Sequence, residues 1–200
     1  MPGEPMTGRG RASRERIVGR AAELFAGRGI AATSVDEVLA AAGAGKGQFY
    51  HYFRSRDELA AAAVGYRCAQ VVAGLTQALG GVSSLAGLEQ ALAGFVAGFE
   101  QAGMPGCPIG TLATEVAGRN EAARLQAAAG FDAWERLLAG ALERMRQRGE
   151  LRADAPPGLL ATGLLASIEG GMVLSQARKD MASLRIAVDA GLAQVRTCLK

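Results

Sequence analysis

Three short helical segments separated by glycines occupy residues 13–57, and they restrict the fold more than any other feature of the sequence. The first segment carries one apolar stripe at helical spacing, made by Ile17, Ala21, Leu24 and Phe25. A second helix is predicted after Ser34, which has capping-box spacing to Glu37, and Gly43 ends it. A third is expected over about 46–52, because Ser55 and Glu58 repeat the capping-box spacing and start a fourth. Short helices joined by a glycine turn are typical of a helix-turn-helix.

The rest of the chain is expected to form longer helices, separated by breaks at GGVSS, GMPGCP and GELRADAPPG. Their expected ranges are about 59–79, 85–102, a short segment beginning at Pro108, 121–148, 157–177 and 181–199. No strand pattern interrupts them. The sequence therefore predicts an all-α fold of about nine helices.

Composition excludes several classes of protein. The single histidine is His51, and the three cysteines are far apart without a CxxC pair, so we expect no metal, no cofactor and no disulfide framework. No uninterrupted apolar run approaches the roughly 18 residues of a membrane span, and residues 1–12 lack the apolar core of a signal peptide. We expect a cytoplasmic protein that does not use a membrane.

The positive charge is concentrated near the N-terminus. Residues 1–56 hold nine Lys/Arg and five Asp/Glu, whereas residues 57–200 hold thirteen and fourteen. This asymmetry indicates an anionic partner for the first quarter of the chain.

The stretch AGAGKGQFYHYF, residues 42–53, predicts contact with phosphates, either of a nucleotide or of DNA. A nucleotide-binding P-loop fails here, since Ala40 stands at the first glycine position, Gly47 replaces the Mg²⁺-binding hydroxyl, and the preceding segment is helical. The DNA interpretation fits: Gly43 permits a sharp turn, and Gly45 and Gly47 let backbone amides approach a phosphate.

The polar side chains of the same stretch suit DNA as well. Lys46 adds a charge, the Gln48 amide can pair with adenine, and Tyr50 and His51 can reach the sugar-phosphate backbone. The rings of two further residues can anchor this helix to the core, namely Phe49 and Phe53.

Residues 23–59, ELFAGRGIAATSVDEVLAAAGAGKGQFYHYFRSRDEL, resemble the TetR family of bacterial transcriptional regulators. SIEGGMVLSQARKD looks like a dimerisation helix of that family, and GCPIGTLATEV resembles a motif of its LmrA/YxaF-like branch. The resemblance implies a flexible arm at 1–12, a helix-turn-helix domain at 13–57 and a ligand-binding and dimerisation domain at 58–200. It further implies a homodimeric repressor that binds a palindromic double-stranded DNA operator and is released by a small-molecule effector.

Carried over by position, the resemblance implies a set of DNA contacts. The expected phosphate contacts are Thr33, Lys46, Tyr50, His51 and Arg56. Gln48 is the expected base reader, and Ala44 and Gly45 are expected to approach bases or sugars closely.

The C-terminal part offers candidates for effector binding. An apolar cavity is expected to use Phe95, Phe99, Phe131, Trp134 and Met172. Cys107 precedes Pro108 at an expected helix start, where backbone amides would stabilise a thiolate. These residues predict an effector that is apolar or thiol-reactive, although each one also fits an ordinary core position.

Apolar stripes on the last two helices predict their burial, either in the protomer's own core or in a partner's. With the resemblance, they indicate a homodimer through a four-helix bundle. The expected interface residues are Leu164, Ser167, Ile168, Gly171, Leu184, Val188, Leu192 and Val195.

Two alternatives to a ligand-released repressor stay open at this point. One is a helix-turn-helix activator or architectural protein without an effector. The other is an enzyme, which the absence of a second histidine or of a metal-ligand spacing disfavours.

Overall fold

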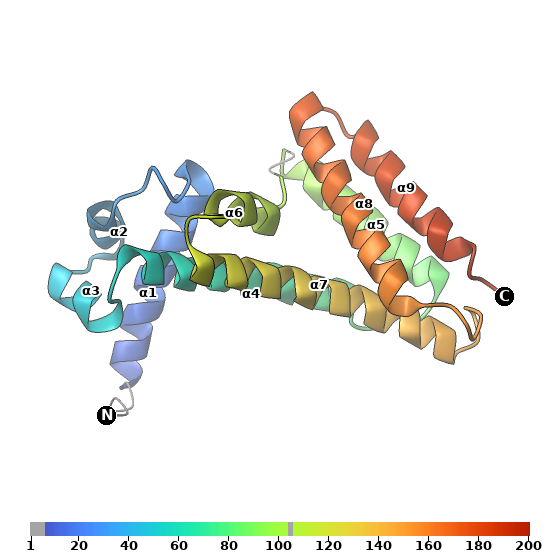
Figure 1. Ribbon diagram of the computed structural model, residues 1–200, viewed down its shortest axis with the longest axis horizontal. Helices are drawn as coiled ribbons and strands as arrows, with labels where there is room; N and C mark the ends of the chain where they lie inside the picture. Colours follow the sequence, from blue (N-terminus) through green and yellow to red (C-terminus); the bar gives the residue numbers. More distant parts are fainter. Residues whose placement is uncertain (1–6, 104–105) are drawn as a thin grey trace. The chain divides into compact units, whose positions relative to one another are not determined.

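The computed structural model describes residues 7–103 and 106–200, and within these ranges the fold consists of nine α-helices (Figure 1). In chain order they are α1 (Gly8–Arg28), α2 (Val35–Ala42), α3 (Lys46–Tyr52), α4 (Arg56–Leu79), α5 (Leu85–Gln101), α6 (Pro108–Val116), α7 (Glu121–Gln147), α8 (Pro157–Arg178) and α9 (Ala182–Arg196). The expected all-α class and helix order are confirmed, and the one β-type pairing in the described residues is a bridge between Leu151 and Leu199.

The chain divides into two compact units, each built from separate stretches of sequence. The first unit contains the residues up to Ala69 together with Leu112–Ala128, and the second contains Gln70–Thr111 together with Ala129–Lys200. The N-terminal unit is therefore larger than the helix-turn-helix alone, because it includes the end of α6 and the beginning of α7.

Helix α1 begins earlier than the sequence indicates. Its N-cap is Thr7, whose hydroxyl accepts a hydrogen bond from the Gly10 N–H at 3.2 Å. Residues 8–12, expected in a flexible arm, are therefore helical, whereas residues 1–6 of that arm lie outside the described part of the chain. The apolar stripe did not reveal this start, since the added turn carries arginines and glycines instead of core residues.

In the N-terminal unit, a small apolar core holds α1, α2 and α3 together. Its large buried side chains include Ile17, Phe25, Val38, Leu39, Phe49 and Phe53. Arg16 ties α1 to the end of α2 by donating to the Ala42 carbonyl at 2.9 Å, and the Arg14 guanidinium lies over the Phe53 ring, 5.2 Å from its centroid.

In the second unit, α8 and α9 lie side by side (Figure 1) because glycines remove side chains between them. A Cβ at Gly171 would lie 2.8 Å from the Ala187 Cβ, and a Cβ at Gly191 would lie 2.6 Å from Leu164 Cδ1. The hydroxyl of buried Ser175 accepts from the Leu184 N–H at 2.9 Å, which fixes the start of α9 against α8. The small residues of this stretch thus serve packing between two helices of one protomer.

Helices α4 and α8 are long and apolar enough to cross a membrane when only length and composition are considered. The expectation that no segment spans a membrane was based on the lack of a long uninterrupted apolar run, and neither helix contains one. Each has another use for its apolar side chains: α8 packs on α9, and the C-terminal half of α4 lines a cavity described below.

Candidate nucleic-acid interface and effector cavity

The turn between α2 and α3 is fixed by a left-handed glycine. Gly43 has φ 58° and ψ 41°, and its N–H donates to the Ala40 carbonyl at 3.2 Å. The next N–H, of Ala44, donates to the Leu39 carbonyl at 2.9 Å. These bonds end α2 within one residue and set the direction in which α3 leaves.

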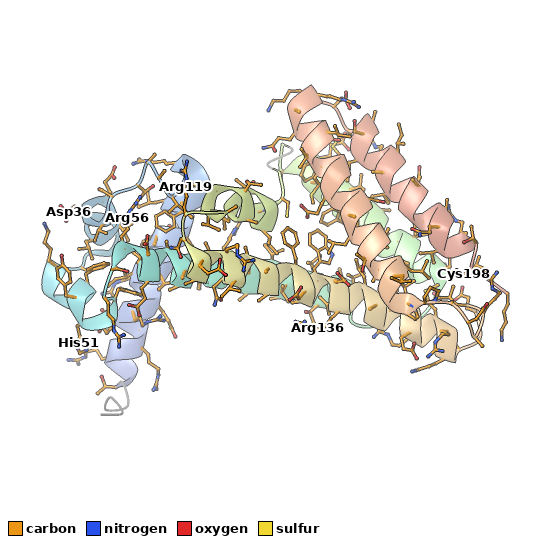
Figure 2. The ribbon with its side chains drawn as sticks, viewed as in Figure 1. Asp36, His51, Arg56, Arg119, Arg136 and Cys198 are labelled. Atoms are coloured by element: carbon orange, nitrogen blue, oxygen red, sulfur yellow. The ribbon has the colours of Figure 1, made fainter. Side chains whose placement is uncertain are left out.

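Helix α3 presents two different faces. Phe49 and Phe53 are almost completely buried, with ring centroids 5.6 Å apart, and they anchor the helix as expected. The Lys46 side chain and Tyr50 are each 71% exposed, and His51 is exposed in the last turn, where a cation suits the helix dipole. Figure 2 labels His51 on α3 and Asp36 on α2.

Gln48 has an internal role that the sequence analysis missed. Its Oε1 accepts from the Gly45 N–H at 3.1 Å, and its Nε2 donates to the Ser13 hydroxyl of α1 at 3.4 Å. The amide therefore caps α3 and joins it to α1 in the free protein. The spacing from Gly45 to Gln48 equals that of the two capping boxes identified in the sequence, so a signal was present.

Nothing in the fold requires the two glycines at the start of α3. A Cβ added at Gly45 or at Gly47 would meet no atom within 4 Å, and Gly45 has an ordinary extended φ of −97°. Gly43 differs, because its positive φ favours glycine. The open space at Gly45 and Gly47 is the room that a close approach by a ligand backbone needs.

Two expected phosphate contacts are engaged inside the protein instead. Thr33 is buried, and its hydroxyl donates to the Gly29 carbonyl at 2.8 Å. Arg56 donates from Nη2 to three backbone carbonyls of the loop between α1 and α2, those of Ile30, Ala31 and Thr33. In this structure both side chains hold the loop, and the Arg56 side chain is also exposed.

The same loop is held from the end of α6, which sequence reasoning did not connect with the helix-turn-helix. Glu115 Oε1 accepts from the Ala31 N–H at 2.8 Å. Asn120, the N-cap of α7, donates from Nδ2 to the Asp57 carbonyl at 2.9 Å. These partners are 84 and 63 residues apart in sequence, so no local pattern reveals them.

The second unit contains an apolar cavity of about 560 Å³. Most of its wall comes from α4 and α5. The lining residues are Gln70, Val71, Gly74, Leu75, Ala78, Leu79, Gln90, Ala91, Leu92, Gly94, Phe95, Pro108 and Trp134. The Phe95 and Trp134 rings lie 5.7 Å apart between centroids. The polar side chains of the lining are the amides of Gln70 and Gln90, so the wall carries no charge.

The structure brings only two of the expected effector residues, Phe95 and Trp134, to this cavity. The others, Phe99, Cys107, Phe131 and Met172, lie outside its lining, although Cys107 adjoins Pro108. The α4 side of the wall was missed, because nothing in the sequence distinguishes its aliphatic and small residues from those of an ordinary packed helix.

Cys107 occupies the expected helix start, but its chemistry differs from the expectation. Its Sγ accepts from the Gly110 N–H at 3.3 Å, which makes it the N-cap of α6. Burial raises the pKa of the thiol to about 12, and the adjoining Glu169 carboxyl adds to the rise. Burial also raises the pKa of Glu169. Burial of the thiol therefore opposes the stabilised thiolate that the sequence predicts, and it gives no support to a thiol-reactive effector.

Most of the expected interface residues are buried within one protomer. Leu164, Ile168, Gly171, Leu184, Val188, Leu192 and Val195 are buried, and Ser167 is half-buried with its hydroxyl donating to the Gly163 carbonyl at 2.9 Å. A different set of large apolar side chains on α8 and α9 is exposed, namely Leu159, Val173, Leu174 and Ile186.

Comparison with known proteins places this arrangement in a family. Residues 17–63 match the bacterial regulatory proteins of the tetR family, and residues 84–190 match the C-terminal domain of LmrA/YxaF-like transcriptional regulators. The chain belongs to the TetR family of transcriptional regulators. The expected family and branch are thereby confirmed, and α2 and α3 lie within the segment that matches the family's N-terminal model.

Individual relatives agree over nearly the whole chain. The HTH-type transcriptional regulator YxaF of Bacillus subtilis is 31% identical over 92% of this chain and 95% of its own. An HTH-type transcriptional regulator of Mycobacterium tuberculosis is 33% identical over 86% of this chain and 88% of its own. The crystal structure of a TetR-family regulator from Cytophaga hutchinsonii has the same fold, with a TM-score of 0.83 at 22% identity and 98% coverage of both chains.

The open space at Gly47 gives a direct test of close approach by DNA. Gly47→Ala should leave the fold intact or stabilise it by up to about 1 kcal/mol, since alanine favours a helix, but it should weaken operator binding because the methyl group meets the DNA. Thermal unfolding and fluorescence anisotropy measure the two effects. Gly27→Ala, an equally open position on α1, should leave binding unchanged. Equal affinity of the Gly47→Ala and wild-type proteins would contradict the close approach.

Proposed function

We propose that this TetR-family regulator is a cytoplasmic repressor that binds a palindromic operator as a homodimer and is released by a neutral, apolar small molecule. The observation that carries the proposal is the exposed face of α3, where Lys46, Tyr50 and His51 stand beside glycines that the fold does not require. A face of this kind offers cations, hydrogen-bond donors and room for a phosphate backbone.

The proposed DNA contacts are a subset of those expected from the sequence. Lys46, Tyr50 and His51 bind phosphates, Gln48 reads a base edge, and Ala44 and Gly45 approach the DNA closely. Gln48 must exchange its bonds to Gly45 and Ser13 for a base, which is a feasible exchange since its side chain is exposed. Thr33 and Arg56 are left out, because the Thr33 hydroxyl and Nη2 of Arg56 bond to the backbone of the loop before α2.

Loss of a phosphate contact and loss of a base contact should affect DNA affinity in different ways. Lys46→Ala should weaken binding to operator and random DNA alike and reduce the salt slope by about 0.9 per lost phosphate contact. Gln48→Glu keeps an oxygen for the Gly45 N–H but loses the amide donor. It should therefore reduce the difference in binding free energy between operator and random DNA by about 1–3 kcal/mol. Anisotropy titrations at several salt concentrations, with an operator selected from a random pool, measure both. Unchanged affinity, salt slope and ratio in folded dimers would refute the placement of the recognition helix.

The exposed apolar residues of α8 and α9 are the proposed dimer surface. Ile186 of α9 is 68% exposed, and three further large apolar side chains are exposed on α8, namely Leu159, Val173 and Leu174. Burying such side chains against a second copy is favourable by about 25 cal/mol per Å² of apolar area. The buried stripe between α8 and α9 supports the surface from within the protomer.

Ile186→Glu should therefore separate the dimer without unfolding the protomer. The carboxylate would be desolvated at the interface but free in the monomer. Light scattering at micromolar concentration and far-UV circular dichroism measure mass and fold. Leu125→Glu introduces the same charge at a 51%-exposed leucine of α7 in the other unit and should leave the mass unchanged. A wild-type monomer, or an Ile186→Glu dimer, would contradict the proposal.

The cavity beside Trp134 is the proposed effector site. Its volume falls in the range of about 300–1,000 Å³ that small-molecule sites occupy, its wall is apolar, and two glutamine amides can orient one polar group. Since Trp134 is the sole tryptophan of the chain, its fluorescence reports on this cavity alone.

A neutral aromatic probe tests the site without knowledge of the natural effector. N-phenyl-1-naphthylamine should quench Trp134 with a saturable titration and release the protein from operator DNA. Gly94→Leu should fill the cavity and abolish both effects, because a Cβ at Gly94 meets no atom within 4 Å. Gly98→Leu, one turn further along α5 and outside the lining, is the matched control. Quenching that persists in Gly94→Leu would move the effector site elsewhere.

A further inference from the structure

An ion pair joins the first turns of α2 and α3. Lys46 Nζ lies 3.2 Å from Asp36 Oδ1, with the two side chains 71% and 69% exposed. Pairs exposed to this degree add only about 0–1 kcal/mol to stability. Stability therefore does not account for a carboxylate beside the lysine that is proposed to bind phosphate.

Helix capping does not account for Asp36 either. Ser34 and Glu37 form a complete capping box: the Ser34 N–H donates to Glu37 Oε2 at 2.8 Å, and the Glu37 N–H donates to the Ser34 hydroxyl at 3.2 Å. Hydrogen bonds to its carboxylate from the Ser34 N–H and, at 2.7 Å, from the Ser34 hydroxyl lower the pKa of Glu37, which also pairs with Arg28 at 3.3 Å. Asp36 is a second anion in this turn, and its partner lies on α3.

We propose that Asp36 competes with DNA phosphates for Lys46 and thereby limits the affinity of the regulator for DNA of any sequence. The inference rests on the proposed function, in which Lys46 is a phosphate contact. To bind, Lys46 must exchange the carboxylate for a phosphate, and Asp36 is then left without its cation beside a polyanion. Both consequences oppose binding, and both occur twice in a dimer.

The effect must depend on salt, because the groups involved are exposed. The electrostatic part of DNA affinity arises from the counterions that bound cations release. A lysine that is already paired with a carboxylate releases fewer counterions on binding than an unpaired lysine, so it adds less to DNA affinity. Asp36→Asn keeps the shape of the side chain and removes its charge, so it should raise affinity for random DNA about three- to tenfold at low salt, with the gain fading as salt rises.

A double-mutant cycle tests the competition. Asp36→Asn, Lys46→Met and the double variant are titrated with random duplex and with selected operator at several salt concentrations, and unfolding temperatures verify the fold. Asp36→Asn should strengthen binding to both DNAs in the wild-type background and change it less than about twofold in the Lys46→Met background. Glu121→Gln is the matched control, since it removes an exposed carboxylate paired with Arg124 at 2.6 Å in the first turn of α7.

Several results would overturn the inference. An undiminished gain in the Lys46→Met background would mean that Asp36 simply repels phosphates. Weaker operator binding by Asp36→Asn, with random DNA unaffected, would mean that the carboxylate accepts from a base. Unchanged binding by Asp36→Asn, in a protein that binds DNA through Lys46, would refute the competition and leave the proposed function standing. A wild-type protein without affinity for any DNA would refute both.

Discussion

One guanidinium group holds the backbone of the loop that leads into α2 and α3. The loop before α2 has no regular secondary structure, so its backbone polar groups need partners from elsewhere. Arg56 Nη2 supplies a donor to the carbonyls of Ile30, Ala31 and Thr33, and Glu115 accepts from the Ala31 N–H. Because this loop precedes α2, and α2 leads through a tight glycine turn into α3, the Arg56 hydrogen bonds help to fix where both helices begin.

A buried threonine completes this loop. The Thr33 hydroxyl donates to the Gly29 carbonyl, and Gly29 has a positive φ of 85° at the end of α1. A Cβ at Gly29 would lie 3.1 Å from Glu115 Oε1, so the glycine also makes room for the carboxylate that holds Ala31. Thr33 and Arg56, which the family resemblance marks for DNA contact, therefore both hold the loop that leads into α2.

Local chemistry explains how much of the fold the sequence predicts. Capping pairs and turn glycines act over three to five residues, so the limits of α2 and α3 could be read directly from Ser34, Gly43 and Ser55. The roles of Arg56, Glu115 and Asn120 could not, because their partners lie 23 to 84 residues away. The early start of α1 was missed for a different reason: a solvent-exposed first turn leaves no apolar period.

Apolar periodicity predicts that a side chain is buried but not what buries it. The α9 stripe of Leu184, Val188 and Leu192 fits a partner's surface and the protomer's own α8 equally well on the sequence, and the structure places it inside the protomer. The same ambiguity separated Phe95 and Trp134, which line the cavity, from Phe99, which does not. Only the packed arrangement distinguishes a core, a cavity wall and an exposed interface.

The glycines of this chain differ in whether the fold requires them. Gly43 is explained by its left-handed backbone, and Gly171 by the 2.8 Å that would separate its Cβ from Ala187. Gly47 has neither reason: it lies in the first turn of a helix, where alanine would be favoured by about 1 kcal/mol, and open space surrounds it. An open helical glycine is not by itself a binding residue, since Gly27 on α1 is equally open. Gly47 differs because it lies on the short helix that carries the exposed Lys46 and Tyr50. This position beside Lys46 is the reason that Gly47, and not Gly27, carries the proposed contact with DNA.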